Sequence, residues 1–287
     1  MKDRSIGRKV LVLLLFAIAL FLIMYPFVSN YLFEHRTASE CNVINQEVED
    51  VGSEKLADAL EEARKYNRVV ASGHVQLTDP FEGDIGHEEV DNYEDLCNIQ
   101  NNGVMGTIEI PVINVNLPIY HGTSDAVLNK GVGHLHGTSL PVGGETTHSV
   151  LTGHTGLSNA KLFTDLEKME KGDVFFLHVL GETLAYEVYD INVVTPDNLT
   201  KLKVEPGKDY CTLLTCTPYG VNSHRLLVHG QRTEYKEAVK QVKKQDRVVP
   251  SKWMDEYKKA LLIGFLILYV ILLSSYVVSR VKALAVE

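Results

Sequence analysis

Two uncharged apolar blocks near the ends of the chain constrain its fold more than any other feature. Residues 10–28 and 260–279 contain no charged side chain. Each block is long enough to cross a bilayer, which takes roughly 20 apolar residues. We therefore expect two transmembrane helices, with a region of about 230 residues between them that folds in water.

Each block has an alternative interpretation. The basic tail at residues 1–9 also precedes cleaved signal peptides, but their apolar region is shorter, about 7–15 residues, and ends in small side chains. Here the block ends near the bulky Tyr25-Pro26-Phe27, which favours a membrane anchor. The alternative for residues 260–279 is a buried core helix. Because this block is apolar on every face, a second span is favoured.

The charges flanking the blocks predict the topology. Basic flanks stay in the cytoplasm, which places residues 1–9 and, after two spans, residues 280–287 inside. The region between the spans would then lie on the extracellular face of a two-pass membrane protein. The second span alone is ambiguous, because Lys252, Lys258 and Lys259 precede it. A net charge of -9 argues against nucleic acid as a partner.

The region between the spans divides into three parts. Residues 29–102 carry apolar stripes and turn formers, which predict helices with a break near Gly52 and then a long loop. Residues 103–233 contain many short alternating runs, which predict a closed or nearly closed β-barrel with one helix beginning near Ser158. Residues 234–259 are charged and lack a core stripe, as in a solvated stalk.

The best candidate for covalent chemistry is Cys216, which ends an apolar strand-like run, with Arg225 following one loop later. A thiolate at a strand end can reach a substrate, and a nearby cation helps it form. The alternatives are a small buried cysteine and a surface arginine. Among the other cysteines, a Cys41–Cys97 bridge is left open, whereas Cys211 and Cys216 would face opposite sides of a strand.

His154 is the candidate acid and base. It lies where a strand gives way to a loop, between Gly153 and Gly156, and imidazole transfers protons near neutral pH. The alternative is a turn histidine without a role. His134 and His136 form an H-x-H pair that suggests metal binding, but no further ligands complete a set, so a structural role is favoured.

Asp79-Pro80-Phe81 has two interpretations. One is an ordinary Asp-Pro turn with a packed aromatic ring. The other is a plug, in which Asp79 pairs with Arg225 while Phe81 covers the Cys216 thiol. Residue physics alone does not choose between them.

Together these segments resemble the sortase family over Gly103 to Arg232. The resemblance rests on Thr212-Leu213-Leu214-Thr215-Cys216, on Arg225 and on the Gly153-His154 turn. The Asp79-Pro80-Phe81 element, the helical region before it and the second apolar block further resemble the class C branch, which polymerises pilins.

The resemblance implies a mainly β fold, an eight-stranded barrel with short helices, on the outer face of a Gram-positive cell membrane. It implies a cysteine transpeptidase without metal or organic cofactor, in which Cys216 is the nucleophile, His154 the general acid and base, and Arg225 the carbonyl or oxyanion stabiliser. An LPXTG-like sorting signal would be cleaved through a thioester on Cys216. A lysine amine of the next pilin would resolve that thioester as an isopeptide bond, and Asp79, Pro80 and Phe81 would form a lid.

Three alternatives remain at this point. The same catalyst could anchor proteins to the cell wall by using a peptidoglycan amine as acceptor. The chain could be a non-enzymatic, membrane-tethered binding domain. A metal hydrolase using His134 and His136 is the least favoured.

Overall fold

The computed structural model describes residues 2–72, 77–81, 92–157, 160–245, 247–249 and 251–284. Contacts between Cα atoms divide the chain into two units, residues 1–249 and residues 250–287. The first unit holds the β-barrel and the N-terminal helices, and the second unit is a single helix with short flanks.

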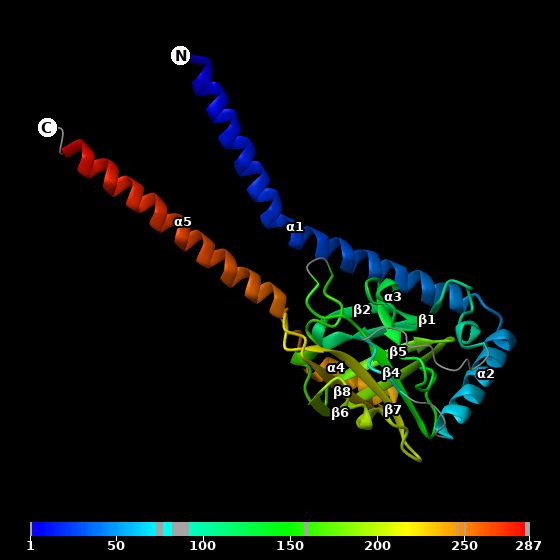
Figure 1. Ribbon diagram of the computed structural model, residues 1–287. Helices are drawn as coiled ribbons and strands as arrows, with labels where there is room; N and C mark the ends of the chain where they lie inside the picture. The colour runs from blue at the N-terminus through cyan, green and yellow to red at the C-terminus, as the bar shows by residue number, and fades with distance from the viewer. Residues whose placement is uncertain are drawn as a thin grey trace. The chain divides into compact units, whose positions relative to one another are not determined.

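Within the described residues, eight strands close into a barrel in the order β1-β2-β3-β4-β7-β8-β6-β5 (Figure 1). Pairing of β1 with β5 closes the ring. The β2–β3 and β4–β7 pairs are parallel and the other pairs are antiparallel. The predicted barrel is therefore confirmed. The strands are β1 (Val104–Ile110), β2 (Val115–His121), β3 (Val132–His134), β4 (Thr147–Thr152), β5 (Val174–Val179), β6 (Glu182–Val194), β7 (Asp209–Thr217) and β8 (His224–Thr233).

Side chains alternate between the inside and the outside of the barrel. On β7, Cys211 and Leu213 belong to the main core, whereas Leu214 belongs to a separate apolar cluster on the outer face. That outer cluster consists of Leu135, Val150, Leu202, Leu214 and Leu227. Alternation along a strand thus builds two apolar layers from one sequence run.

Helix α1 (Lys2–Glu49) runs without a break from the apolar block into a segment that packs on β1 and β2 (Figure 1). Its packed face places Thr37, Cys41 and Ile44 in buried positions at helical spacing. The hydroxyl of Tyr120 donates to Glu40 at 3.1 Å, which ties the helix to β2. Pro26 lies inside the helix.

Helix α2 (Ser53–Ala71) follows the break predicted near Gly52. Its Asn67 side chain donates to the Leu140 carbonyl at 3.2 Å and accepts from the Leu140 N–H at 2.7 Å. This pair of bonds fixes α2 on the loop after β3. The remaining short helices of the barrel unit are η1 (Tyr93–Asp95), η2 (Pro111–Ile113), α3 (Asp125–Leu128), η3 (Leu166–Lys168), η4 (Thr200–Leu202) and α4 (Tyr235–Gln245).

Two segments differ from the sequence prediction. The helix expected after Ser158 is absent from the described part of residues 160–169, which instead forms turns and η3, although Leu162, Leu166 and Met169 are buried. Ser158 itself lies outside the described residues. The predicted stalk begins with α4, whose Ala238 is buried against Val174, Phe176 and Ala185 on the barrel. A single buried alanine is too weak a pattern to be recognised in the sequence as a core-facing apolar stripe.

Membrane spanning is supported for one end of the chain. Within the described residues, Leu14–Glu49 of α1 is the one helical segment long and apolar enough to cross a membrane, since it contains an 18-residue window of mean hydropathy 1.9. Helix α5 (Lys252–Leu284) is 33 residues long and exposes large apolar side chains such as Leu262 and Phe265. The second span stays a prediction.

Candidate active site

Strand register places the three candidate residues in one row. Cys216 on β7 is the direct antiparallel partner of Arg225 on β8. On the other side, β4 runs parallel to β7 with Thr152 opposite Leu214. The next residue, Gly153, is still bonded to Leu214, so the turn that follows β4 carries His154 to the Cys216 end of β7. Because neighbouring strands lie about 4.8 Å apart, the order His154–Cys216–Arg225 forms a compact row on the outer face of the barrel.

The turn that carries His154 is fastened to β7 by two hydrogen bonds. The Gly153 N–H donates to the Leu214 carbonyl at 3.1 Å, and the Thr215 hydroxyl donates to the Gly153 carbonyl at 2.7 Å. A Cβ on Gly153 would come within 2.8 Å of the Phe163 ring, so a side chain is sterically excluded there. These contacts hold the base of the turn at the level of Cys216.

Arg225 is buried, with 6 % of its surface exposed, which excludes the surface-arginine interpretation. Its Nε donates to Asp79 Oδ1 at 2.8 Å and its Nη2 to Asp79 Oδ2 at 2.5 Å. Asp79 is equally buried, at 6 % exposed. Two parallel charge-assisted bonds of this kind fix both orientation and distance. The segment 77–81 is thereby held against the row.

Phe81 occupies the space between the outer residues of the row. The Arg225 guanidinium carbon lies 5.0 Å from the ring centroid, and the His154 ring centroid lies 5.6 Å from it. Phe81 and Leu77 also pack on the outer apolar cluster, which includes Leu214. Pro80 between them is buried. The segment thus combines one ion pair with apolar contacts on both sides of it.

Burial sets the charge states of the row. Burial raises the pKa of the Cys216 thiol, although the Arg225 cation lowers it and Asp79 raises it again. Burial lowers the pKa of His154, against an opposing effect of Asp125. Desolvation disfavours the charged form of each group. Beneath the segment, both Cys216 and His154 are therefore biased toward their neutral forms.

The H-x-H pair serves structure. His134 is fully buried, its Nε2 lies 2.9 Å from the Ser139 carbonyl and its Nδ1 lies 2.9 Å from the Tyr93 hydroxyl. Burial lowers the pKa of His134 to about 3. The Tyr93 ring stacks on His136 at 4.1 Å. No group of three potential metal ligands occurs among the described residues.

All four cysteines are free and buried thiols. The bridge left open between Cys41 and Cys97 is therefore not formed in this structure. Cys211 lies in the barrel core, on the opposite face of β7 from Cys216, as its spacing predicts.

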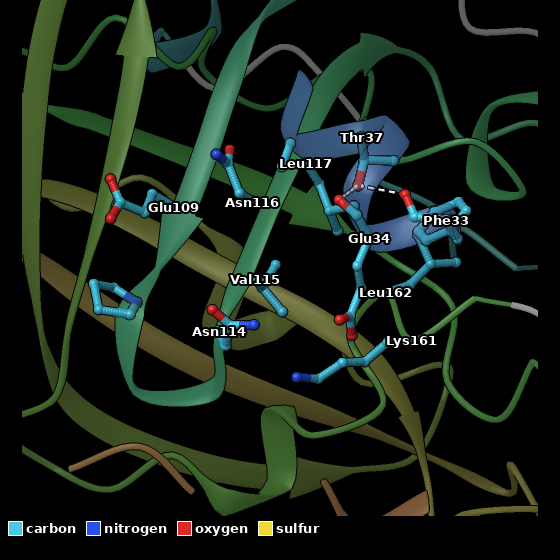
Figure 2. Close-up of a pocket in the computed structure, with 12 residues that line it drawn as sticks. Phe33, Glu34, Thr37, Glu109, Asn114, Val115, Asn116, Leu117, Lys161 and Leu162 are labelled. Atoms are coloured by element: carbon cyan, nitrogen blue, oxygen red, sulfur yellow. Dashed lines mark hydrogen bonds between the residues drawn. The ribbon is translucent and has the colours of Figure 1, made fainter. Parts of the chain in front are cut away.

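A cavity of about 250 Å³ lies apart from the row, between α1 and the β1–β2 hairpin (Figure 2). Glu34 and Lys161 extend along its lower side, and the Thr37 hydroxyl is tied to the Phe33 carbonyl at 3.0 Å. None of the six candidate residues lines this cavity. The cavity lies where α1 does not fully cover the β1–β2 hairpin.

Sequence reasoning missed two features of the site. Thr215 was noted only as part of a motif, yet its hydroxyl links the histidine turn to the cysteine strand. The outer apolar cluster was also missed, because its five members come from five separate segments of the chain. The alternation along β7 indicates that Leu214 faces outward, but no local sequence pattern predicts its contact with Leu135 or Leu202.

Comparison with known proteins gives a consistent result. The Sortase domain family matches residues 108–233. Sortase A of Streptococcus agalactiae serotype III (strain NEM316) is 32 % identical over 131 residues, covering 45 % of this chain and 52 % of that relative. The chain thus spans about half the length of this curated relative.

Solved structures match over a longer range. Streptococcus pneumoniae sortase C is 42 % identical with a TM-score of 0.63, over 69 % of this chain and 97 % of that one. The description of that structure refers to pilin substrate specificity. Sortase C-1 of Actinomyces oris is 50 % identical with a TM-score of 0.60, over 63 % and 99 %.

Proposed function

The chain belongs to the sortase family, and on that premise we propose that it is a cysteine transpeptidase of the pilin-polymerising class. The observation that carries the proposal is the His154–Cys216–Arg225 row, formed by the turn after β4 together with β7 and β8. It supplies a proton carrier in the turn after β4, a nucleophile on β7 and a cation on β8. Class C relatives at 42 % and 50 % identity support the pilin-building assignment.

In the acylation step, the Cys216 thiolate attacks the threonine carbonyl of an LPXTG-like sorting signal. The resulting oxyanion lies next to the Arg225 guanidinium, which stabilises it by charge and hydrogen bonding. His154 donates a proton to the departing amine, and collapse of the intermediate leaves an acyl thioester on Cys216. The C-terminal fragment leaves with a free amine.

In the second step, a lysine amine of the next pilin attacks the thioester. His154, now neutral, accepts a proton from the attacking amine. The sulfur departs as a thiolate, and an isopeptide bond joins the two subunits. No metal or organic cofactor takes part in either step.

The segment 77–81, which we call the lid, restrains this chemistry. With the lid in place, Asp79 occupies the donors of Arg225 that the oxyanion needs. Removal of the lid would expose Cys216 and His154 to water and leave Arg225 as the nearest charge to the thiol. Both changes favour the thiolate–imidazolium form. Lid displacement therefore precedes acylation.

Anchoring by α1 would hold the barrel at the cell membrane, with the catalytic domain on the extracellular face. The uncharged run of α1 and the basic residues before it support that orientation. The second span at residues 260–279 would make the protein two-pass.

The acceptor decides between the proposed function and cell-wall anchoring. The full-length protein in detergent should be incubated with an LPXTG-bearing peptide and either a purified pilin or a peptidoglycan stem peptide. We expect an isopeptide-linked pilin product. Exclusive transfer to the stem peptide would reassign the protein to wall anchoring, and no transfer to either acceptor would favour a binding domain.

A further inference from the structure

Thr152 carries a buried hydroxyl without a hydrogen-bond partner. The residue is 0 % exposed, and its Oγ1 has no partner among the described residues. Leaving a buried hydroxyl unpaired carries a free-energy penalty, so such groups are uncommon in folded proteins. A partner that arrives only with a ligand would account for it.

The position of Thr152 points to that ligand. It is the last residue of β4, lies two residues before His154 and pairs with Leu214 on β7. It shares the outer face with Val150, so its side chain projects on the same side of the sheet as Cys216. Its other neighbour in the sheet is Gly133, which has no side chain to approach the hydroxyl.

The lid gives this hydroxyl apolar surroundings. Leu77 and Phe81 pack on the outer cluster, whose members Val150 and Leu214 flank Thr152 along and across the strands. The one charged side chain of the lid is used elsewhere, because both Asp79 carboxylate oxygens accept from Arg225, and Thr152 Oγ1 has no hydrogen-bond partner among the described residues. The closed lid thus covers this part of the face without pairing the hydroxyl.

We propose that Thr152 binds the acyl-donor peptide, its hydroxyl donating to a backbone carbonyl in the residues that precede the scissile threonine. This inference rests on the proposed function. Two residues of β4 span roughly 7 Å, which matches two residues of an extended peptide running back from Cys216. The LPXTG-like signal contains proline, which has no N–H, so carbonyl oxygens are the groups it offers there.

One hydroxyl then acts on two equilibria with opposite sign. It disfavours the closed lid, beneath which it is unpaired, and favours bound peptide, which pairs it. Thr152→Val keeps the shape and removes the hydroxyl. We therefore expect this variant to close the lid more firmly and to bind the donor peptide less tightly. A purely structural role for Thr152 would move both quantities through a loss of stability instead.

The test uses the full-length protein in detergent and the variants Thr152→Val, Thr152→Ser and Thr152→Ala. We measure kcat and KM for cleavage of an LPXTG peptide, the labelling rate of Cys216 by a methanethiosulfonate without peptide, and the thermal midpoint. For Thr152→Val we expect kcat/KM to fall about three- to tenfold, mainly through KM, as one hydrogen bond predicts. Labelling should slow, and Thr152→Ser should match the unmodified chain.

An unchanged KM in Thr152→Val, or equal KM values in Thr152→Val and Thr152→Ser, would overturn the inference. Thr152→Ala serves if the valine variant does not fold, since it also lacks the hydroxyl. Cys216→Ala distinguishes failure of the proposed function from failure of the role of Thr152. If that variant still cleaves the peptide, the proposed function fails; if it is inactive and Thr152→Val behaves normally, only the role of Thr152 fails.

Discussion

Arg225 and Asp79 form a two-pronged ion pair between the row and the lid, with bonds of 2.8 and 2.5 Å. Both side chains are almost fully removed from water, at 8 % and 3 % exposed. Removing one partner of such a buried ion pair costs more stability than the intact pair contributes, because the other charge is left buried without a counter-ion. The lid and the cation proposed for catalysis are thus coupled.

The first prediction concerns Asp79→Ala. Without the carboxylate, the buried Arg225 charge is relieved only when the lid opens and water enters. We expect Cys216 labelling by a methanethiosulfonate to accelerate by about tenfold or more, since each 1.4 kcal/mol shifts an equilibrium tenfold. Peptide-level mass spectrometry identifies the labelled cysteine.

Asp197→Ala is the matched control, because it removes the same charge from an exposed loop position. It should leave the labelling rate unchanged. Equal labelling rates for Asp79→Ala and the unmodified protein would show that this ion pair does not hold the lid.

The second prediction concerns Thr215, whose hydroxyl donates to the Gly153 carbonyl at 2.7 Å. Thr215→Val removes the hydrogen bond that holds the His154 turn against β7, while it keeps the volume of the side chain. We expect kcat for peptide cleavage to fall by about tenfold with little change in KM, because proton transfer depends on position. Thr215→Ser should restore most of the rate. A loss in KM alone would contradict this positioning role.

A closed or nearly closed barrel could be predicted from alternating strand runs, whereas its strand number came from the family resemblance. β3 shows why the runs alone were insufficient. It is only three residues long, Val132–His134, and pairs with β2 in parallel. A run that short carries no period of its own. The α4 helix was missed as part of the fold because Ala238 is its one fully buried residue on the barrel, and Val239 and Val242 are only partly buried there.

The third prediction is a loss of stability in acid. Burial, together with a smaller contribution from neighbouring His148, lowers the pKa of His229 from 6.5 to about 4. The unfolded chain binds a proton below pH 6.5 that the folded chain refuses until about pH 4, so the free energy of unfolding falls as pH falls through that window. His229 alone should account for about 2 kcal/mol between pH 7 and pH 5.

Urea unfolding of the full-length protein in detergent at the two pH values measures this effect. His229→Asn, whose side-chain amide can replace the bond to Thr212, should reduce the pH-dependent loss by that amount. The Thr212 hydroxyl lies 2.7 Å from His229 Nδ1 in the unmodified protein. An identical pH dependence in the variant would show that His229 does not carry the effect.

Site residues could be predicted where the residue type and its local sequence indicate a chemical role. They were harder to predict where the fold brings together residues that are distant in sequence. Cys216 and Arg225 flank one hairpin, so their pairing follows from local sequence. His154 lies far away in sequence and reaches the row only because β4 and β7 run parallel. The unpaired hydroxyl of Thr152 could not be predicted from the sequence, because it depends on the absence of a hydrogen-bond partner among all the residues that pack around it.

The most direct test of the account is the intact mass of the full-length protein after incubation with an LPXTG peptide and no acceptor amine. In both the unmodified chain and Asp79→Ala, we predict a mass increase equal to the acyl fragment, located on Cys216 and removed by hydroxylamine. Cys211→Ala, the matched buried cysteine on the same strand, should acylate normally, and Cys216→Ala should not acylate. An adduct that persists in Cys216→Ala, or no adduct in folded Asp79→Ala, would contradict the account.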